Sequence, residues 1–153
     1  MLKNKILCVC LVTAAIVLLA GCNKKTAIKT DIVQGKVTMD GSPLADAMVT
    51  FSPTGNEGKV GTGTTDASGQ YKLQTLLGNP DAGTTSGDYI VTVSKQENVS
   101  TGKQEMSESE GKMVNVVQAK QLVPAKFTNK KSSPLKATVV EGQVNSFDFD
   151  VSK

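Results

Sequence analysis

The sequence contains no histidine, no arginine and no tryptophan, although 17 of its 153 residues are lysines. Without histidine there is no Ser–His or Cys–His nucleophile pair, no imidazole general base and no imidazole metal ligand. Without arginine there is no bidentate clamp for a carboxylate or a phosphate. Carboxylates, lysines, hydroxyls and two tyrosines remain. We therefore expect a protein that is not an enzyme, with no catalytic residues, no metal site and no cofactor.

Cysteine is also scarce, and the three that occur, Cys8, Cys10 and Cys22, all lie near the start of the chain. Two lysines among the first five residues are followed by an almost wholly apolar run over residues 6–19 that carries no charge. A helix needs about 20 apolar residues to cross a bilayer core, so this run is too short for a stable span. A basic start, a short apolar run and small residues after it predict a secretory signal peptide over residues 1–21.

The residues that follow, Leu19-Ala20-Gly21-Cys22, resemble the bacterial lipobox, in which a leucine stands three positions before the cysteine and small residues lie between. The resemblance implies that diacylglycerol is attached to the Cys22 sulfur, that the chain is cleaved after Gly21, and that the new amine is acylated. Two or more acyl chains hold a protein stably on a membrane, whereas one holds it only marginally. The covalent lipid, of the palmitate type, would be the protein's one non-protein group.

The predicted location is the cell envelope, with the membrane as a partner through the lipid anchor. Residue 23 is an asparagine rather than an aspartate. In a Gram-negative host this feature of lipoproteins implies delivery to the outer membrane. The polar segment after the cysteine, residues 22–30, is predicted to be a tether between lipid and domain.

Cleavage leaves 153 − 21 = 132 residues, which is enough for one domain. Only Cys22 remains, so no disulfide within the chain can stabilise it and an apolar core must do so. Losing Lys3 and Lys5 reduces the formal charge from +3 to +1. A nearly neutral body argues against nucleic acid as a partner.

The body, residues 31–153, reads as short strands between turn signals. Apolar and polar residues alternate with a period of two over 33–39, 47–52, 71–73, 88–94, 135–139 and 147–151, and the glycine-rich stretch 60–65 is compatible with an edge strand. We expect an all-β fold: a single antiparallel β-sandwich, transthyretin-like or Ig-like, of about seven strands. The polar stretch 95–121 does not fit this pattern. It is interpreted as a mobile surface insert, in which residues 113–117 form either a further strand or a helical turn.

The body resembles the carboxypeptidase regulatory-like domain, a small transthyretin-like β-sandwich, over residues 32–94. The residues that carry the resemblance are Gly35, Val37, Asp40-Gly41, Pro43-Leu44-Ala45-Asp46-Ala47, Val49, Thr65-Asp66, Gly69, Tyr71, Leu73, Gly87, Tyr89 and Val91. The continuation, including Val123-Pro124-Ala125-Lys126-Phe127, is similar to small lipoproteins of planctomycete-type bacteria, which imply no activity. Asp40, Gly41, Pro43, Asp66 and Gly69 are expected to have structural roles in turns.

Several polar groups are candidate sites. Asp148 and Asp150 lie two residues apart on one strand face, and Asp40, Asp46 and Asp66 come from turns; calcium binding is the alternative to a solvated or structural role. Lys24, Lys25 and Lys29 either touch anionic head groups or lie on a soluble tether. Glu105, Glu108 and Glu110 are interpreted as solvated loop.

We expect a non-enzymatic binding, interaction or structural module of the envelope, whose further partner is an envelope protein or a polysaccharide. The alternatives are a carbohydrate- or peptide-binding accessory domain and a hydrolase based on carboxylates. Sugar sites usually expose aromatic rings, and Tyr71, Tyr89 and Phe127 are the candidates here. We expect these three rings to be buried, with the tyrosine hydroxyls bonded at the rim.

Overall fold

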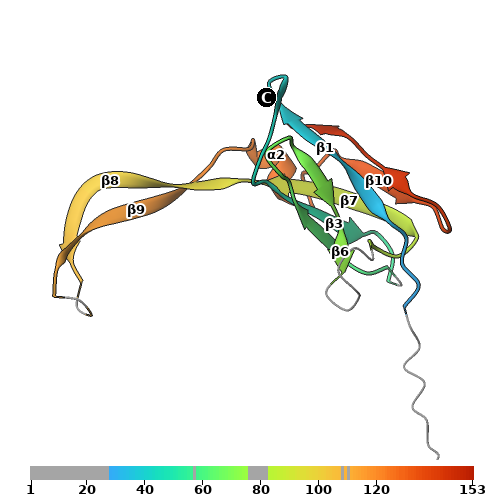
Figure 1. Cartoon of the computed structure of the whole chain (residues 1–153), viewed down its shortest axis with the longest axis horizontal. Helices are drawn as coiled ribbons and strands as arrows, with labels where there is room; N and C mark the ends of the chain where they lie inside the picture. The colour runs from blue at the N-terminus through green and yellow to red at the C-terminus, as the bar shows by residue number, and fades with distance from the viewer. Residues whose placement is uncertain (1–27, 57, 76–82, 108, 110) are drawn as a thin grey trace, which may run out of the picture.

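The body of the protein is a sandwich of two five-stranded β-sheets (Figure 1). A computed structural model describes residues 28–56, 58–75, 83–107, 109 and 111–153. The first sheet contains β1 (Val33–Met39), β2 (Ser42–Pro43), β5 (Gln70–Lys72), β11 (Asn145–Ser146) and β12 (Phe149–Asp150). The second sheet has the order β10 (Lys136–Val139), β7 (Gly87–Ser94), β3 (Met48–Pro53), β4 (Gly61–Thr64) and β6 (Gln74–Thr75).

The core lies between the sheets and is made by the alternating residues of the strands. Val33 and Val37 of β1 are fully buried, as are Val91 and Val93 of β7, while the residues between them are more exposed. Phe51 of β3 occupies the centre, with ring centroids 5.8–6.4 Å from Tyr71, Tyr89, Phe147 and Phe149. Burying a side chain of this size contributes about 1.5–3 kcal/mol. The expected all-β sandwich is confirmed. Its core consists mainly of valines and aromatic rings contributed by both sheets.

The direction of one set of strands differs from the expectation of a purely antiparallel fold. β1 pairs in parallel with β11, where Val33 stands opposite Asn145, and with β12, where Val37 stands opposite Phe149. Almost the whole body lies between these strands in the sequence, so the connection is long enough for parallel pairing. Apolar alternation fixes which face of a strand is buried but does not encode its direction, so the sequence could not reveal this.

The described residues contain twelve strands rather than about seven, partly because predicted strands are divided between partners. The stretch after the Asp66–Gly69 turn contributes β5 to the first sheet, where Tyr71 stands opposite Gly35 of β1. Two residues later the same stretch crosses over as β6 and pairs with β4 in the second sheet. One amphipathic segment therefore links the two layers.

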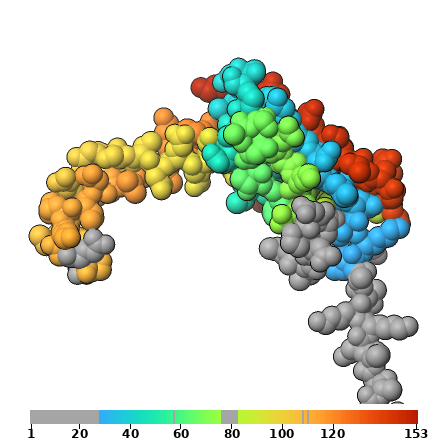
Figure 2. Space-filling view, viewed as in Figure 1, coloured from blue at the N-terminus to red at the C-terminus, as the bar shows by residue number. Residues whose placement is uncertain are grey.

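The stretch 95–121, expected to be a surface insert in which residues 113–117 form either a strand or a helical turn, forms a long exposed β-ribbon, and residues 113–117 belong to its second strand. β8 (Gln96–Met106) and β9 (Met113–Gln121) pair with each other and with no other strand among the described residues. The ribbon extends away from the sandwich as a slender arm (Figures 1 and 2). All eleven residues of β8 are exposed, so the arm has no buried face. For that reason its sequence lacks the hydrophobic periodicity from which strands are predicted.

A single helical turn, α2 (Ala125–Thr128), follows the arm and buries Phe127. Within the described part of the chain no helix has the length and apolar character needed to span a bilayer.

Candidate functional site

The predicted anchor lies outside the described residues. This applies to the lipobox residues Leu19, Ala20 and Gly21, to Cys22, and to Lys24 and Lys25 of the tether. Their roles therefore stay predictions from the sequence.

The chain becomes fixed to the sandwich soon after the structure begins to describe it. Lys29 Nζ forms an ion pair with Glu141 at 2.5 Å, and the two groups raise the pKa of the lysine and lower that of the carboxyl, through their hydrogen bond first. Asp31 forms an isolated antiparallel bridge with Thr84, and its Oδ1 accepts a bond from Gly142 N at 2.7 Å. Lys29 is thus directed toward the body, and the folded domain begins at about residue 31.

The three candidate aromatic rings are buried: Tyr71, Tyr89 and Phe127 are each less than 5% exposed. Tyr71 donates its hydroxyl proton to the carbonyl of Phe147 at 2.8 Å, and Tyr89 donates to the carbonyl of Thr85 at 2.7 Å. Burial, reinforced by the charge of Asp148, raises the pKa of the Tyr71 hydroxyl well above its ordinary value. The Tyr71 hydroxyl is therefore a buried hydrogen-bond donor that ties β5 to the segment at Phe147.

Three of the five candidate aspartates, Asp66, Asp148 and Asp150, accept hydrogen bonds within the fold. Asp148 Oδ1 accepts a hydrogen bond from Lys36 N at 2.8 Å, and Asp150 accepts from the amide and hydroxyl of Ser152. Asp66 Oδ1 accepts from the amides of Ser68 and Gln70 and from the Ser68 hydroxyl, and this last bond is the main cause of the lowered pKa of Asp66. Among the described residues no three acidic or cysteine side chains converge as metal ligands.

The turn residues have distinct geometries. Asp40 and Gly41 both have positive φ, 51° and 78°, which is the two-residue type I′ pattern, and they join β1 to β2. Gly69 has φ 76° and donates its amide to the carbonyl of Asp66 at 2.9 Å. Pro43 lies in β2, opposite Thr38 of β1.

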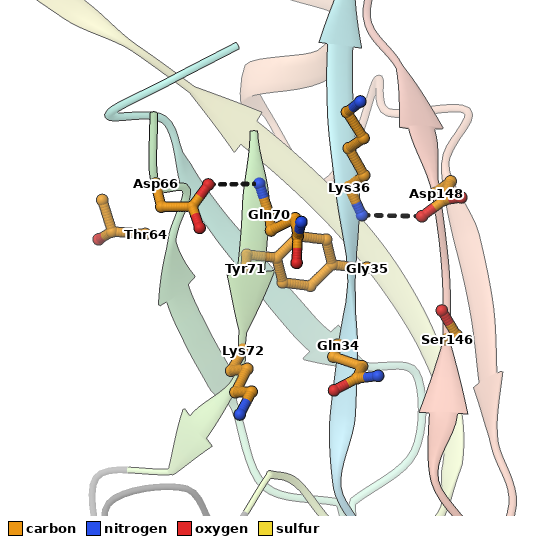
Figure 3. Close-up of a pocket in the computed structure, with 10 residues that line it drawn as sticks. All are labelled: Gln34, Gly35, Lys36, Thr64, Asp66, Gln70, Tyr71, Lys72, Ser146 and Asp148. Atoms are coloured by element: carbon orange, nitrogen blue, oxygen red, sulfur yellow. Dashed lines mark hydrogen bonds between the residues drawn. The ribbon is translucent and has the colours of Figure 1, made fainter. Parts of the chain in front are cut away.

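A polar groove of about 460 Å³ lies beside β1 and β5 (Figure 3). Its charged and amide groups come from Gln34, Lys36, Asp66, Gln70, Lys72 and Asp148. Its one aromatic residue, Tyr71, is buried, so the groove offers no exposed ring on which a sugar could stack. Both of its carboxylates, Asp66 and Asp148, accept hydrogen bonds from backbone amides.

The most unusual surface is the arm, which sequence reasoning did not assign to any function. Side chains alternate between the faces of a ribbon, and directly opposed residues share a face. One face, called here the uncharged face, is formed by Gln96, Asn98, Ser100, Gln104 and Met106 of β8 and by the opposed residues Gln121, Ala119, Val117, Asn115 and Met113 of β9. Three apolar members are strongly exposed: Met106 at 67%, Val117 at 57% and Met113 at 55%.

No family model and no curated protein matches this chain. Among solved structures, a 9R-lipoxygenase from Cyanothece PCC8801 aligns at 12% identity and a TM-score of 0.37, over 82% of this chain and 16% of that chain. The chain thus spans a small part of that enzyme's length, and the likeness carries no argument about function.

Proposed function

We propose that this protein is a lipoprotein of the bacterial cell envelope, held on a membrane by lipid on Cys22, whose β-sandwich acts as a non-enzymatic interaction module. The observation that carries the proposal is the tetrapeptide Leu19-Ala20-Gly21-Cys22, placed directly after a basic start and a short apolar run. The chain between Cys22 and Asp31, whose backbone is hydrogen-bonded to that of Thr84, is short. Such a tether would keep the domain near the membrane surface.

Three features support an interaction module over an enzyme. The sequence lacks histidine and arginine. Three candidate carboxylates, those of Asp66, Asp148 and Asp150, accept structural hydrogen bonds, and the hydroxyls of both tyrosines are bonded to backbone carbonyls. The burial of the three candidate rings counts against the carbohydrate-binding alternative. The arm, by contrast, offers an extended exposed surface that a globular scaffold does not need for its own stability.

Metabolic labelling tests the anchor. Cells that express the full chain would be grown with a clickable palmitate analogue, and their membrane and soluble fractions compared. We expect the wild-type protein to be labelled and found in the membrane fraction. Cys22→Ser should lose the label and keep its signal, so that it migrates as a precursor longer by 21 residues.

Cys10→Ser is the matched control because that cysteine is predicted to leave with the signal, so labelling of the mature protein should be unchanged. Recovery of the unsubstituted protein in the cytosol, or labelling that persists in Cys22→Ser, would disprove the proposal.

A further inference from the structure

The arm has two free edges of different character. Because β8 and β9 pair only with each other among the described strands, each leaves one row of backbone N–H and C=O groups unpaired by any strand. The β8 edge is interrupted by a bulge between Ser100 and Gln104, where Gly102 adopts φ 73°. The same strand carries the charges of Glu97, Lys103 and Glu105. A bulge and several charges are the means by which proteins prevent edge strands from pairing.

The β9 edge lacks these protections. The strand Met113–Gln121 has the sequence MVNVVQAKQ, with no glycine or proline, three valines and a single charge at Lys120. Valine favours extended structure, and an unprotected edge of this kind is a template for another strand. The asymmetry between the two edges points to β9 as the side on which a further strand adds.

The arm also gains from an added strand. A two-stranded ribbon is only marginally stable in water. A sheet of three or more strands with an apolar face can be stable on its own. Every residue of β8 is exposed, and in β9 only Val116 and Gln121 are partly covered. The ribbon therefore lacks the packing that would normally hold it.

We propose that β9 of one copy pairs with β9 of a second copy of this chain, antiparallel about a two-fold axis at Val117. The product is a four-stranded sheet in the order β8–β9–β9–β8. An axis at Val117, the midpoint of the strand, lets all nine residues overlap. In this register Lys120 faces Val114 of the other copy, whereas an axis at Val116 would place Lys112 opposite Lys120.

The chemistry of the arm favours a second copy over a different partner. An antiparallel pair with this axis is isologous, so one surface serves both partners. Residues that face each other share a face of the sheet, so the two uncharged faces become continuous. Met113 then lies opposite Gln121 of the other copy, Asn115 opposite Ala119, and Val117 opposite its own counterpart. No like charges meet.

The size of the contact explains why the anchor matters. A nine-residue strand is about 30 Å long, and edge pairing of two such strands buries less than the roughly 1,200 Å² of a stable interface. Confinement to one membrane raises the effective concentration of the arms and offsets the small area. This step rests on the proposed lipid anchor, whereas the pairing itself does not.

Site-specific crosslinking tests the pairing in the full-length chain. Cys22 would carry lipid on its sulfur, so Val117→Cys supplies the one free thiol of the mature protein. Opposed residues of antiparallel strands have Cα atoms about 4.5–5.5 Å apart, which a disulfide can span. Isolated membranes would be treated with a mild oxidant and, separately, with a short bismaleimide, and then run on non-reducing gels. We expect a band of twice the monomer mass.

Ser100→Cys is the matched control. Ser100 is exposed, lies on the same face as Val117 and stands directly opposite it in β8, whose outer edge carries the bulge and the charges. It should stay monomeric. Asn115→Cys alone should also stay monomeric, but co-expressed with Ala119→Cys it should yield the dimer, which fixes both direction and register.

Three results would overturn self-pairing: no dimer from Val117→Cys, equal dimer from Ser100→Cys, or a crosslinked band whose mass is that of a different partner. The bismaleimide reaction needs no oxidising compartment and can be repeated on concentrated purified protein. Failure of the pairing is therefore read separately from failure of lipidation, which the palmitate label reports. Where both the pairing and the lipidation are observed, Val117→Cys in a chain that starts at residue 23, with neither lipid nor signal, should give at least about tenfold less dimer than the lipidated chain at equal expression, because it is no longer confined to a membrane.

Discussion

At the scale of single residues, the alternation of apolar residues correctly places Gly35 on the inner face of its strand. It does not show why this position must be a glycine. Its place in the alternation of residues 33–39 predicted a core-facing position, and β1 has these bounds. The reason for glycine there is a contact from the far end of the chain. A Cβ atom at residue 35 would lie 1.8 Å from the carbonyl oxygen of Phe147, the same oxygen that accepts the Tyr71 hydroxyl bond. A glycine inside a strand signals such a close approach but not its partner.

We expect Gly35→Ala to lower the free energy of unfolding by about 1–3 kcal/mol, the usual cost of forcing an extra carbon into a packed site. The obstacle is backbone, so it cannot rotate away as a side chain could. Urea denaturation of the chain from residue 23 onward measures the change. Gly55→Ala is the control, since a Cβ there has nothing within 4 Å and the stability should change by less than about 0.5 kcal/mol. Equal stability of the two variants would contradict the packing argument.

At the scale of elements, the strands that sequence predicted best are those with one buried face. β1, β3 and β7 lie where apolar residues alternate, because every second side chain of these strands faces the core. β8 was missed, and β9 was left open as either a strand or a helical turn over residues 113–117, for the complementary reason. Both faces of the arm are solvated, so polar and apolar residues carry no period and the stretch resembles a loop in composition. The uncharged face became visible only when the register paired Met106 with Met113 and Ser100 with Val117.

The arm and the sandwich should be energetically independent. A variant in which an Asn-Gly turn replaces residues 96–121 would connect Lys95 to Leu122, whose backbone groups are already hydrogen-bonded at 2.9 Å. Because the arm buries so little, the free energy of unfolding should change by less than about 0.5 kcal/mol. Thermal melts of the two chains measure this, and hydrogen exchange should be fast in the arm and slow in β3 and β7. A loss of several kcal/mol would show that the arm packs on the body.

At the scale of the whole molecule, local sequence motifs could be predicted, whereas contacts between residues far apart in the sequence could not. The lipobox is a local signal that needs no fold, so it could be read directly. The parallel pairing of β1 with β11 and β12 depends on residues more than 100 positions apart, and no short pattern encodes it. The polar groove beside β1 arises in the same way, since Lys36 and Asp148 meet only after the last strands dock.

The pH dependence of stability follows from the composition of the chain and from its hydrogen-bonded carboxylates. With no histidine, no side chain has an ordinary pKa near neutrality. The pKa values of Asp66 and Asp150 are lowered in the folded state, chiefly by hydroxyl hydrogen bonds from Ser68 and Ser152. A carboxyl whose pKa falls on folding stabilises the protein above its unfolded pKa, about 3.9 for aspartate, and this contribution is lost as pH falls through the folded value.

The free energy of unfolding should therefore be nearly constant from about pH 5 to 8 and should decline below about pH 4. Asp66→Asn keeps an oxygen that can accept the amide bonds of Ser68 and Gln70 but has no charge to protonate, so its acid decline should be shallower than that of the wild type. Ser68→Ala removes one of the three donors to Asp66 and should shift the decline in the same direction by less. Urea midpoints measured at half-unit pH steps would report both effects. An acid limb in Asp66→Asn that superimposes on the wild-type limb would show that the turn carboxylate does not couple to folding.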